Sequence, residues 1–345
     1  MANIVICADG TWNRPEEDLA KDFPTNVLQL SRAIEPAQNG IKQHVFYDWG
    51  LGSYHNRVSA GATGRGIHKN IMDGYRYIVQ NYAPGDKIFL FGFSRGAYTV
   101  RALSGLINNC GVLRRPDARL GAEAWKIYKS PAKKNRPSEF AAKRFREAHS
   151  HPSRNVHFVG VWDTVGALGI PFSLMGLFES HDEFYDTKMG ANVSFARHAL
   201  AIDEQREDFE PTIWLPRPGV DLKQVWFAGV HSDVGGSYPP DEETGIRASD
   251  TPLGWMLDEA HDAGLIVEPH LRASLTEGSQ GKLHKSRKHV YRLKSPLHRP
   301  LVVKDKPTKI HPSVKIRYKA DPKYRPPKLK ALVEEYGWEK LDVGV

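Results

Sequence analysis

The chain has 345 residues, of which 40% are hydrophobic and 26% are charged, a globular composition that excludes a disordered or fibrous protein. No apolar run reaches the roughly 18–20 residues of a membrane-spanning helix, and the N-terminus lacks the basic and apolar regions of a signal peptide. Two cysteines, Cys7 and Cys110, are too few for a disulfide framework or a cysteine-rich metal site. We therefore expect a cytoplasmic protein, and export by a route without a signal peptide stays open.

The net charge of +8 is distributed unevenly. Residues 281–330 contain 17 Lys and Arg against two acids, a net charge of +15, which leaves the other 295 residues at −7. A mildly acidic body argues against a nucleic-acid protein built around one large basic face. A basic appendage that contacts an anionic partner remains open.

Short apolar runs alternate with segments of helical periodicity along the first two thirds of the chain. We predict strands at residues 3–8, 44–48, 87–93, 156–161 and 225–230, and helices at residues 25–34, at 67–82 and from Ser94 to about 109. This alternation predicts the α/β class, with a mostly parallel, doubly wound sheet flanked by helices.

One domain with insertions fits this pattern better than two domains. We predict an α/β domain over residues 1–280, with a helical insertion at 113–155 and a possible lid or cap region at 167–224. Residues 281–345 are predicted to form a basic, Pro-rich extension with short alternating pieces such as 313–319.

A G-x-S-x-G motif, Gly92-Phe93-Ser94-Arg95-Gly96, lies where a buried strand meets a helix. In this context the serine of an α/β-hydrolase-like protein sits on a tight turn above the sheet edge. Gly92 and Gly96 are needed because larger side chains would collide where the strand meets the helix. The helix N-terminus beside Ser94 favours negative charge. The motif therefore predicts a nucleophilic serine.

A serine nucleophile needs a histidine base and a carboxylate that orients the base. Asp163 and His231 each follow a later predicted strand, in the order Ser, Asp, His that such hydrolases use. All three side chains are thus predicted at strand carboxyl ends, where open parallel sheets place their sites. His68 and His198 are interpreted as structural.

An oxyanion hole requires two hydrogen-bond donors. The backbone amide of Arg95, which follows the serine, is the expected first donor. The second is expected from the loop after the first strand, where the amides of Gly10 and Thr11 are the candidates. Asp9 could orient this loop.

Four ordered motifs make the sequence similar to a known family. They are Ala8-Asp9-Gly10-Thr11-Trp12-Asn13, Gly92 to Ala97, Val161-Trp162-Asp163-Thr164-Val165-Gly166 and Gly229-Val230-His231-Ser232-Asp233-Val234-Gly235-Gly236. They resemble the domain of unknown function 2235 family, which includes the first class of type VI secretion phospholipase effectors, and the resemblance covers about residues 3–260. It implies an α/β-hydrolase fold, a triad on Ser94, Asp163 and His231, and glycerophospholipid acyl esters as substrates.

Two alternatives stay open. A metal-dependent hydrolase could use Asp9, Asp163, His231 and Asp233, because carboxylates and histidine suit divalent cations. A non-catalytic module could bind anionic lipid or nucleic acid through the basic segment.

The sequence thus predicts a serine hydrolase that cleaves acyl esters through an acyl-Ser94 intermediate and needs no metal or organic cofactor. The expected partners are an acyl-ester or phospholipid substrate and an anionic membrane surface contacted by residues 281–330, whereas nucleic acid is not expected. Residues 167–180, rich in apolar side chains, could form a lid over the site or a buried connection.

Overall fold

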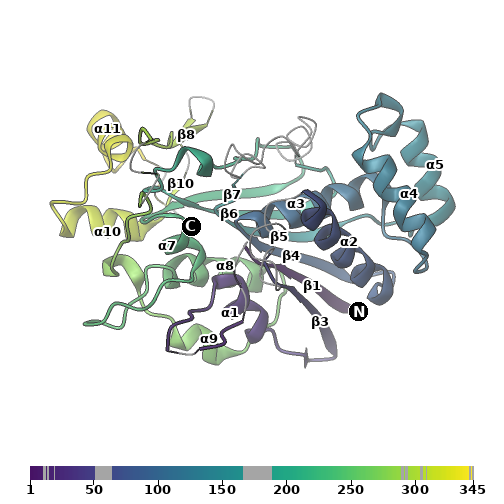
Figure 1. Cartoon of the computed structure of the whole chain (residues 1–345), viewed down its shortest axis with the longest axis horizontal. Coiled ribbons are helices and arrows are strands. Elements are labelled where there is room, and N and C mark those ends of the chain that lie inside the picture. Colours follow the sequence, from purple (N-terminus) through teal and green to yellow (C-terminus); the bar gives the residue numbers. More distant parts are fainter. Residues whose placement is uncertain are drawn as a thin grey trace.

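An eight-stranded sheet forms the centre of the molecule, in the order β10-β7-β6-β5-β4-β1-β3-β2 (Figure 1). The computed structural model describes residues 1–10, 13, 15–18, 20–50, 64–165, 189–288, 291, 294–303, 306–307, 309–341 and 343. The strands are β1 (Ala2–Ala8), β2 (Ala37–Gln38), β3 (Ile41–Asp48), β4 (Lys87–Phe93), β5 (Val156–Trp162), β6 (Val193–Ala201), β7 (Asp221–Phe227) and β10 (Lys309–Ile310). All neighbouring pairs are parallel except β2 with β3. This is the predicted α/β class.

Helices cover both faces of the sheet. The described helices are α1 (Asn26–Ala33), α2 (Gly64–Asn81), α3 (Arg95–Cys110), α4 (Ala118–Lys129), α5 (Phe140–His149), α7 (His231–Gly235), α8 (Asp250–Asp262), α9 (Pro269–Ser274), α10 (Pro312–Ala320) and α11 (Pro327–Tyr336). Short 3-10 turns lie at η1 (Lys133–Asn135), η4 (Glu207–Phe209) and η5 (Gly278–Gln280), and β8 (Val302–Val303) pairs with β9 (Lys306–Pro307). In Figure 1, α2 and α3 cover one face of the sheet, and α1 and α8 cover the other.

The two faces of the sheet form two separate apolar cores because side chains alternate along each strand. In β4, Ile88 and Leu90 pack with α2 and α3, while Phe89 and Phe91 pack toward α1 and α8. A strand buried on both faces needs a nearly continuous apolar run. This explains why the predicted bounds of β4 are confirmed without change.

Several predicted elements have slightly different bounds in the structure. The first helix is α1, and Thr25 caps it because its hydroxyl accepts a hydrogen bond from the amide of Leu28 at 3.1 Å. The predicted strand at 225–230 is wrong at both ends, because β7 is Asp221–Phe227. The alternating piece at 313–319 is not extended but lies in α10, where His311 caps the helix and Pro312 begins it.

The regions predicted as insertion, cap and extension are partly built into the sheet and its cores. Residues 113–155 contain α4, η1 and α5. Residues 193–201, inside the predicted cap region, form β6, which lies between β7 and β5, so this part belongs to the sheet. Residues 167–180, the predicted lid, lie outside the described residues.

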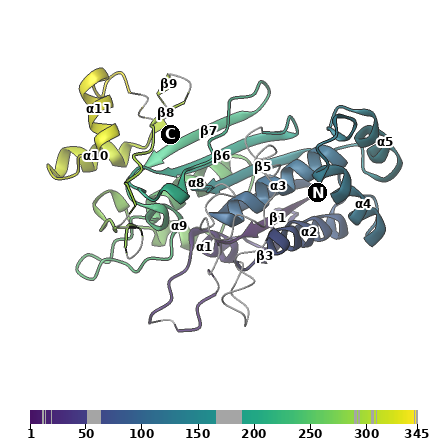
Figure 2. The ribbon, with the colours of Figure 1, turned by 45° about the horizontal axis from the view of Figure 1, so that its top comes forward.

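The basic C-terminal segment packs against the edge of the sheet formed by β7 and β10. Leu301, Ile310 and Leu329 share a buried cluster with Leu200 and Trp226, from β6 and β7. Figure 2 shows α10 and α11 beside the ends of β7 and β6. The boundary at residue 280 stays a prediction, but residues on both sides of it form one core. Across the described parts of the chain, no helix is both long and apolar enough to cross a membrane.

Candidate active site

The Ser94 turn joins β4 directly to α3 in a strained conformation. Ser94 has φ 58° and ψ −121°, a backbone region that residues other than glycine rarely occupy. A Cβ atom on Gly92 would lie 2.5 Å from the carbonyl oxygen of Gly96, and one on Gly96 would lie 2.0 Å from the oxygen of Ala8. The two glycines are therefore required by the close approach of backbones, as the motif predicts.

Asp163 and His231 form a buried pair at the same edge of the sheet. Asp163 directly follows β5, and His231 begins α7 just after β7. Nδ1 of His231 lies 2.6 Å from Oδ2 of Asp163, and the exposed fractions of the two side chains are 6% and 0%. Because a carboxylate only accepts hydrogen bonds, this contact places the proton on Nδ1 and leaves Nε2 as the basic nitrogen.

The serine turn and the histidine are neighbours through Phe93. The Phe93 and His231 rings are 4.6 Å apart between centroids. The backbone amide of Ser94 donates to the carbonyl of Trp162 at 3.1 Å, which ties the turn to the end of β5 just before Asp163. The three residues predicted from sequence thus lie at the carboxyl edge of β4, β5 and β7.

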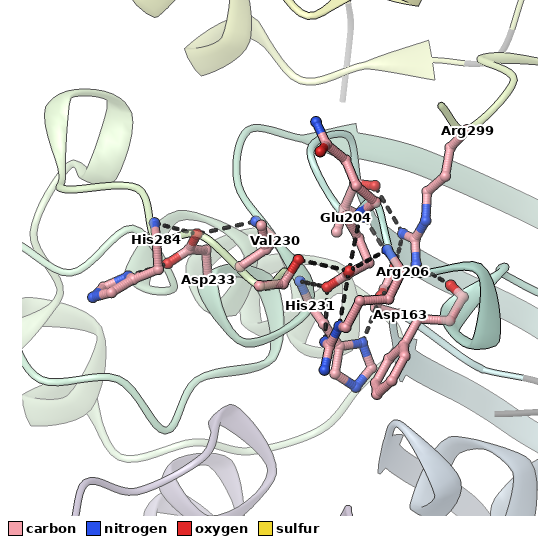
Figure 3. Close-up of polar contacts among 12 residues, drawn as sticks. Asp163, Glu204, Arg206, Val230, His231, Asp233, His284 and Arg299 are labelled. Carbon is pink, nitrogen blue, oxygen red and sulfur yellow. Dashed lines mark hydrogen bonds and ion pairs between the residues drawn. The ribbon is translucent and has the colours of Figure 1, made fainter. Parts of the chain in front are cut away.

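Asp163 also contacts Arg299, which the sequence analysis did not single out. Nη1 of Arg299 lies 2.7 Å from Oδ1 of Asp163 and Nη2 lies 3.1 Å from Oδ2, with both side chains fully buried (Figure 3). The amide of Ala201 also donates to Oδ1 at 3.0 Å. Burial by itself would raise the pKa of Asp163, but the Arg299 charge and the His231 hydrogen bond outweigh it and hold this pKa well below its usual range.

Glu204 is a second buried carboxylate beside His231. Its Oε2 accepts a hydrogen bond from the backbone amide of His231 at 3.2 Å and forms a 2.8 Å ion pair with Arg206. Burial raises the pKa of Glu204, but the hydrogen bonds and charge of Arg206 prevail and lower it to about 2. The Arg206 guanidinium stacks 3.4 Å from the centroid of Phe209, whose ring meets the His231 ring edge-on at 5.0 Å. Glu204 thus holds the backbone amide of His231, and Phe209 packs against one side of the His231 ring.

The loop after β1 lies beside Ser94, as predicted, but one of its predicted donors is occupied. A Cβ atom on Gly10 would lie 3.1 Å from Cβ of Ser94. The amide of Gly10 donates to Oδ1 of Asp9 at 2.7 Å, so in this arrangement it is not free to bind an oxyanion. Thr11 lies outside the described residues, and Arg95 is the first residue of α3.

Asp9 itself is a buried anchor for this loop. Its Oδ2 accepts hydrogen bonds from the hydroxyls of Thr25 at 2.6 Å and Tyr47 at 2.7 Å. Burial raises the pKa of Asp9 to about 6, against the lowering effect of these hydrogen bonds. Asp9 thus anchors the loop after β1 to the N-terminal cap of α1 and to β3.

Asp233 holds the start of α7 rather than joining the other acids in a ligand set. Its Oδ2 accepts from the amide of Val230 at 3.0 Å, and its Oδ1 lies 2.7 Å from Nδ1 of His284. Within the residues that the structure describes, no three His, Cys, Asp or Glu side chains converge as metal ligands would. Among these described residues, the geometry therefore offers the metal-dependent alternative no ligand group.

The two histidines interpreted as structural, His198 and His68, both contact neighbouring residues of the fold. His198 is fully buried in β6, and its Nε2 accepts a hydrogen bond from the amide of Thr164 at 3.2 Å, next to Asp163. Burial lowers the pKa of His198 to about 3, which keeps this ring neutral and able to accept. His68 stacks on Trp125 at 4.3 Å between ring centroids.

Sequence reasoning missed Arg299, Glu204 and Arg206. Glu204 lies three residues after the end of β6, a strand that was not predicted, so its position close to a strand end was a usable signal. Arg299 carries no comparable signal, because it is one of 17 basic residues in a segment that reads as exposed.

These observations define an α/β-hydrolase-like protein, with a parallel sheet, a strained strand–serine–helix turn and a buried Asp–His pair at one edge. The sequence profile of the family described as "T6SS, Phospholipase effector Tle1-like, catalytic domain" matches residues 2–259. The chain belongs to this family.

Individual relatives are distant and longer. A curated yeast relative, "Uncharacterized protein YEL023C" from Saccharomyces cerevisiae, is 27% identical over 239 residues, which are 63% of this chain and 33% of the relative. The chain thus spans about one third of that protein's length.

Two solved structures are also similar. One, the "Crystal structure of an uncharacterized protein from Pseudomonas aeruginosa", has a TM-score of 0.46 and 16% identity over 79% of this chain and 47% of that chain. The other, the "Structure of the Tle1 effector bound to the VgrG spike from the Type 6 secretion system", has a TM-score of 0.39 and 17% identity over 71% and 53%.

Proposed function

We propose that this protein is a serine hydrolase that cleaves acyl esters, with phospholipids as the substrate class, through a covalent acyl-Ser94 intermediate. The observation that carries the proposal is the 2.6 Å contact between His231 Nδ1 and Asp163 Oδ2 beside the strained Ser94 turn. Membership of the phospholipase effector family supports the lipid substrate.

The first half of the reaction acylates the serine. Ser94 Oγ attacks the carbonyl carbon of the ester while its proton passes to Nε2 of His231. The ester C–O bond then breaks, and the departing alcohol takes that proton from Nε2. Asp163 keeps the imidazole oriented and stabilises its charged form through Nδ1.

The second half releases the acyl group. Water gives a proton to Nε2 of His231 and its oxygen attacks the acyl carbon. The bond to Ser94 Oγ breaks, the serine regains its proton from Nε2, and a carboxylic acid leaves. The backbone amide of Arg95 is the proposed first oxyanion donor. Thr11 is the preferred second, because the Gly10 amide is held by Asp9 at 2.7 Å.

A panel of p-nitrophenyl esters and phospholipids tests this mechanism on the wild type and Ser94→Ala. Ser94→Ala is expected to lower kcat by at least roughly 10³-fold, because the covalent route is lost. Ser104→Ala is the matched control, since Ser104 is a buried serine on α3, the helix that Ser94 precedes. Ester hydrolysis that survives Ser94→Ala but not a chelator would contradict the serine mechanism and favour a metal-dependent one.

The partner proposed for the basic C-terminal segment is an anionic membrane surface. β10 runs parallel to β7, and α10 follows it. The helix therefore begins at the carboxyl ends of the strands, where the Ser94 site also lies. Ile316 on α10 is 44% exposed, and Lys319 on the same helix and Lys323 shortly after its end are exposed. An apolar side chain among lysines suits the interface of an anionic bilayer, where each lysine contributes about 1 kcal/mol.

Co-sedimentation with vesicles tests this surface. The triple change Ile316→Asp, Lys319→Glu and Lys323→Glu is expected to weaken binding to phosphatidylserine-containing vesicles and to leave p-nitrophenyl ester hydrolysis intact. The control is Lys133→Glu with Lys134→Glu on η1, between α4 and α5 at the opposite end of the molecule in Figure 1. Equal vesicle binding by the wild type and the triple variant would reject the membrane surface.

A further inference from the structure

The buried guanidinium of Arg299 contacts Asp163 from beyond the family-matched residues 2–259. Its two terminal nitrogens reach both oxygens of Asp163, at 2.7 and 3.1 Å. Nη1 also donates to the carbonyl of Ala201 at 2.8 Å, and Nη2 donates to the carbonyl of Phe209. Figure 3 shows Arg299 approaching Asp163 from the side opposite to His284.

This geometry fixes the plane of the Asp163 carboxylate. A planar guanidinium that bonds both carboxylate oxygens permits one relative orientation, unlike a single point charge. In that orientation Oδ1 also meets the amide of Ala201, and Oδ2 points at Nδ1 of His231. Asp163 has φ 39°, so its backbone is itself in a strained region that side-chain contacts must hold.

Two further contacts tie the same C-terminal segment to the other acids around His231. The Ser286 hydroxyl donates to Oε1 of Glu204 at 2.7 Å. His284 contacts Asp233 through its backbone amide at 3.0 Å and through Nδ1 at 2.7 Å. Asp163, Glu204 and Asp233 thus each contact the start of α7, through the His231 ring or a backbone amide. Each also contacts one residue of the C-terminal segment: Arg299, Ser286 or His284. The arrangement indicates that this segment helps to hold His231 in place.

We propose that Arg299 is a positioning residue for the hydrolysis, which acts through Asp163 by holding its carboxylate against Nδ1 of His231. The inference rests on the proposed function. Arg299 is 1% exposed and therefore does not reach substrate. Its loss should lower kcat and leave KM nearly unchanged, whereas loss of a substrate-binding residue would raise KM.

The pH profile of kcat/KM provides a readout that a purely structural role would not move. Arg299 places a positive charge near the imidazole, and removing this charge favours the protonated ring. The other charged groups around His231 are Asp163 from the end of β5, Glu204 and Arg206 after β6, and Asp233 on α7. Arg299→Met is therefore expected to shift the acid limb of the profile to higher pH, while Arg299→Lys keeps the charge and leaves the limb in place.

The test measures kcat, KM and the pH profile of the full chain for Arg299→Met and Arg299→Lys. We expect kcat to fall roughly 10²-fold for Arg299→Met, the loss that follows from a misplacement of about 1 Å in an active site. Arg299→Lys is expected to lose less. The control is Arg317→Met. Arg317 is a buried arginine of α10, also in the basic C-terminal segment, and it donates to the carbonyl of Gly281. It should keep the wild-type profile even if it lowers stability.

A double-mutant comparison keeps the proposal falsifiable if Arg299→Met alone does not fold. Asp163→Asn combined with Arg299→Met leaves no unpaired buried charge, so this pair is expected to fold. If Arg299 acts through Asp163, adding Arg299→Met to Asp163→Asn lowers kcat by less than about threefold. A full, multiplicative loss would overturn the proposal.

Wild type and Ser94→Ala, assayed in parallel, separate the two claims. Hydrolysis that survives Ser94→Ala would refute the proposed function. Ser94-dependent hydrolysis with unchanged kcat and pH profile in both Arg299 variants would refute only the role of Arg299.

Discussion

Glu204 gives the sharpest quantitative prediction, because its environment combines full burial with several hydrogen bonds. Its side chain accepts from Arg206, from the Ser286 hydroxyl and from the backbone amide of His231. Glu204→Gln keeps the shape but replaces one acceptor oxygen with a donor that would face these donors. We expect this change to destabilise the fold and to loosen the start of α7.

The magnitude follows from the pKa of Glu204, which falls from 4.5 to about 2 in the folded protein. This difference corresponds to about 3 kcal/mol of folding free energy. A carboxyl whose folded pKa is lowered contributes this stability above its unfolded pKa and loses it as the pH falls through its folded pKa. The cost of Glu204→Gln should therefore be about 3 kcal/mol at pH 7 and about 2 kcal/mol at pH 3.5.

Urea unfolding of the wild type and Glu204→Gln at the two pH values measures this cost. Asp258→Asn is the matched control, because Asp258 pairs with Arg272 at the surface, where an ion pair contributes only about 0–1 kcal/mol. A Glu204→Gln cost that is negligible at pH 7, or that grows on acidification, would show that the ionised Glu204 does not stabilise the fold.

Three further outcomes are expected. Gly96→Ala should abolish folding or activity, because its Cβ would lie 2.0 Å from the backbone oxygen of Ala8. Gly121→Ala on α4 should be tolerated, because its Cβ would lie 3.6 Å from the nearest atom, in the Met72 side chain. Soluble yield and ester hydrolysis are measured for both variants. Burial raises the pKa of Asp48 to about 7, so its negative charge destabilises the folded protein above that pH. Asp48→Asn should therefore raise the free energy of unfolding by about 2–4 kcal/mol at pH 8 and leave it almost unchanged at pH 4. An equal effect at both pH values in urea unfolding would contradict this. Cys7 and Cys110 should resist iodoacetamide in the native protein, because both thiols are buried and burial raises their pKa values, that of Cys110 to about 12; rapid alkylation seen by mass spectrometry would count against the packing described.

The sheet and the serine turn could be predicted because their signals are local. The residues of β4 and β5 form apolar runs that end in a turn, and sheet burial on both faces demands such runs. The spacing of Gly92 and Gly96 reports backbone contacts that the structure contains. The placement of Asp163 and His231 could be predicted because strand carboxyl ends meet at one edge of a parallel sheet, and their catalytic roles stay predictions.

The missed features depend on contacts between distant parts of the chain. The strand β6 carries Arg197 and His198 in its middle, and such a strand is stable only because Glu259 and the amide of Thr164 satisfy those side chains. Arg299 is buried only because Asp163, 136 residues away in sequence, lies opposite it. Neither partner can be read from the local pattern.

The hydrogen bond of the Gly10 amide could not be predicted for a different reason. Its position beside Ser94 was predicted, but its donor is taken by the carboxylate of Asp9, one residue earlier. A hydrogen bond between neighbours depends on the side-chain rotamer, which the sequence leaves free.

The most direct test of the central claim is covalent labelling with a fluorophosphonate, which reacts with an activated serine. One adduct per chain is expected, on the peptide that contains Ser94, and none on Ser94→Ala. Labelling should also weaken in Asp163→Asn, because Nδ1 of His231 loses its 2.6 Å carboxylate partner. An unlabelled but ester-hydrolysing wild type, or an adduct on another serine, would show that Ser94 is not the nucleophile.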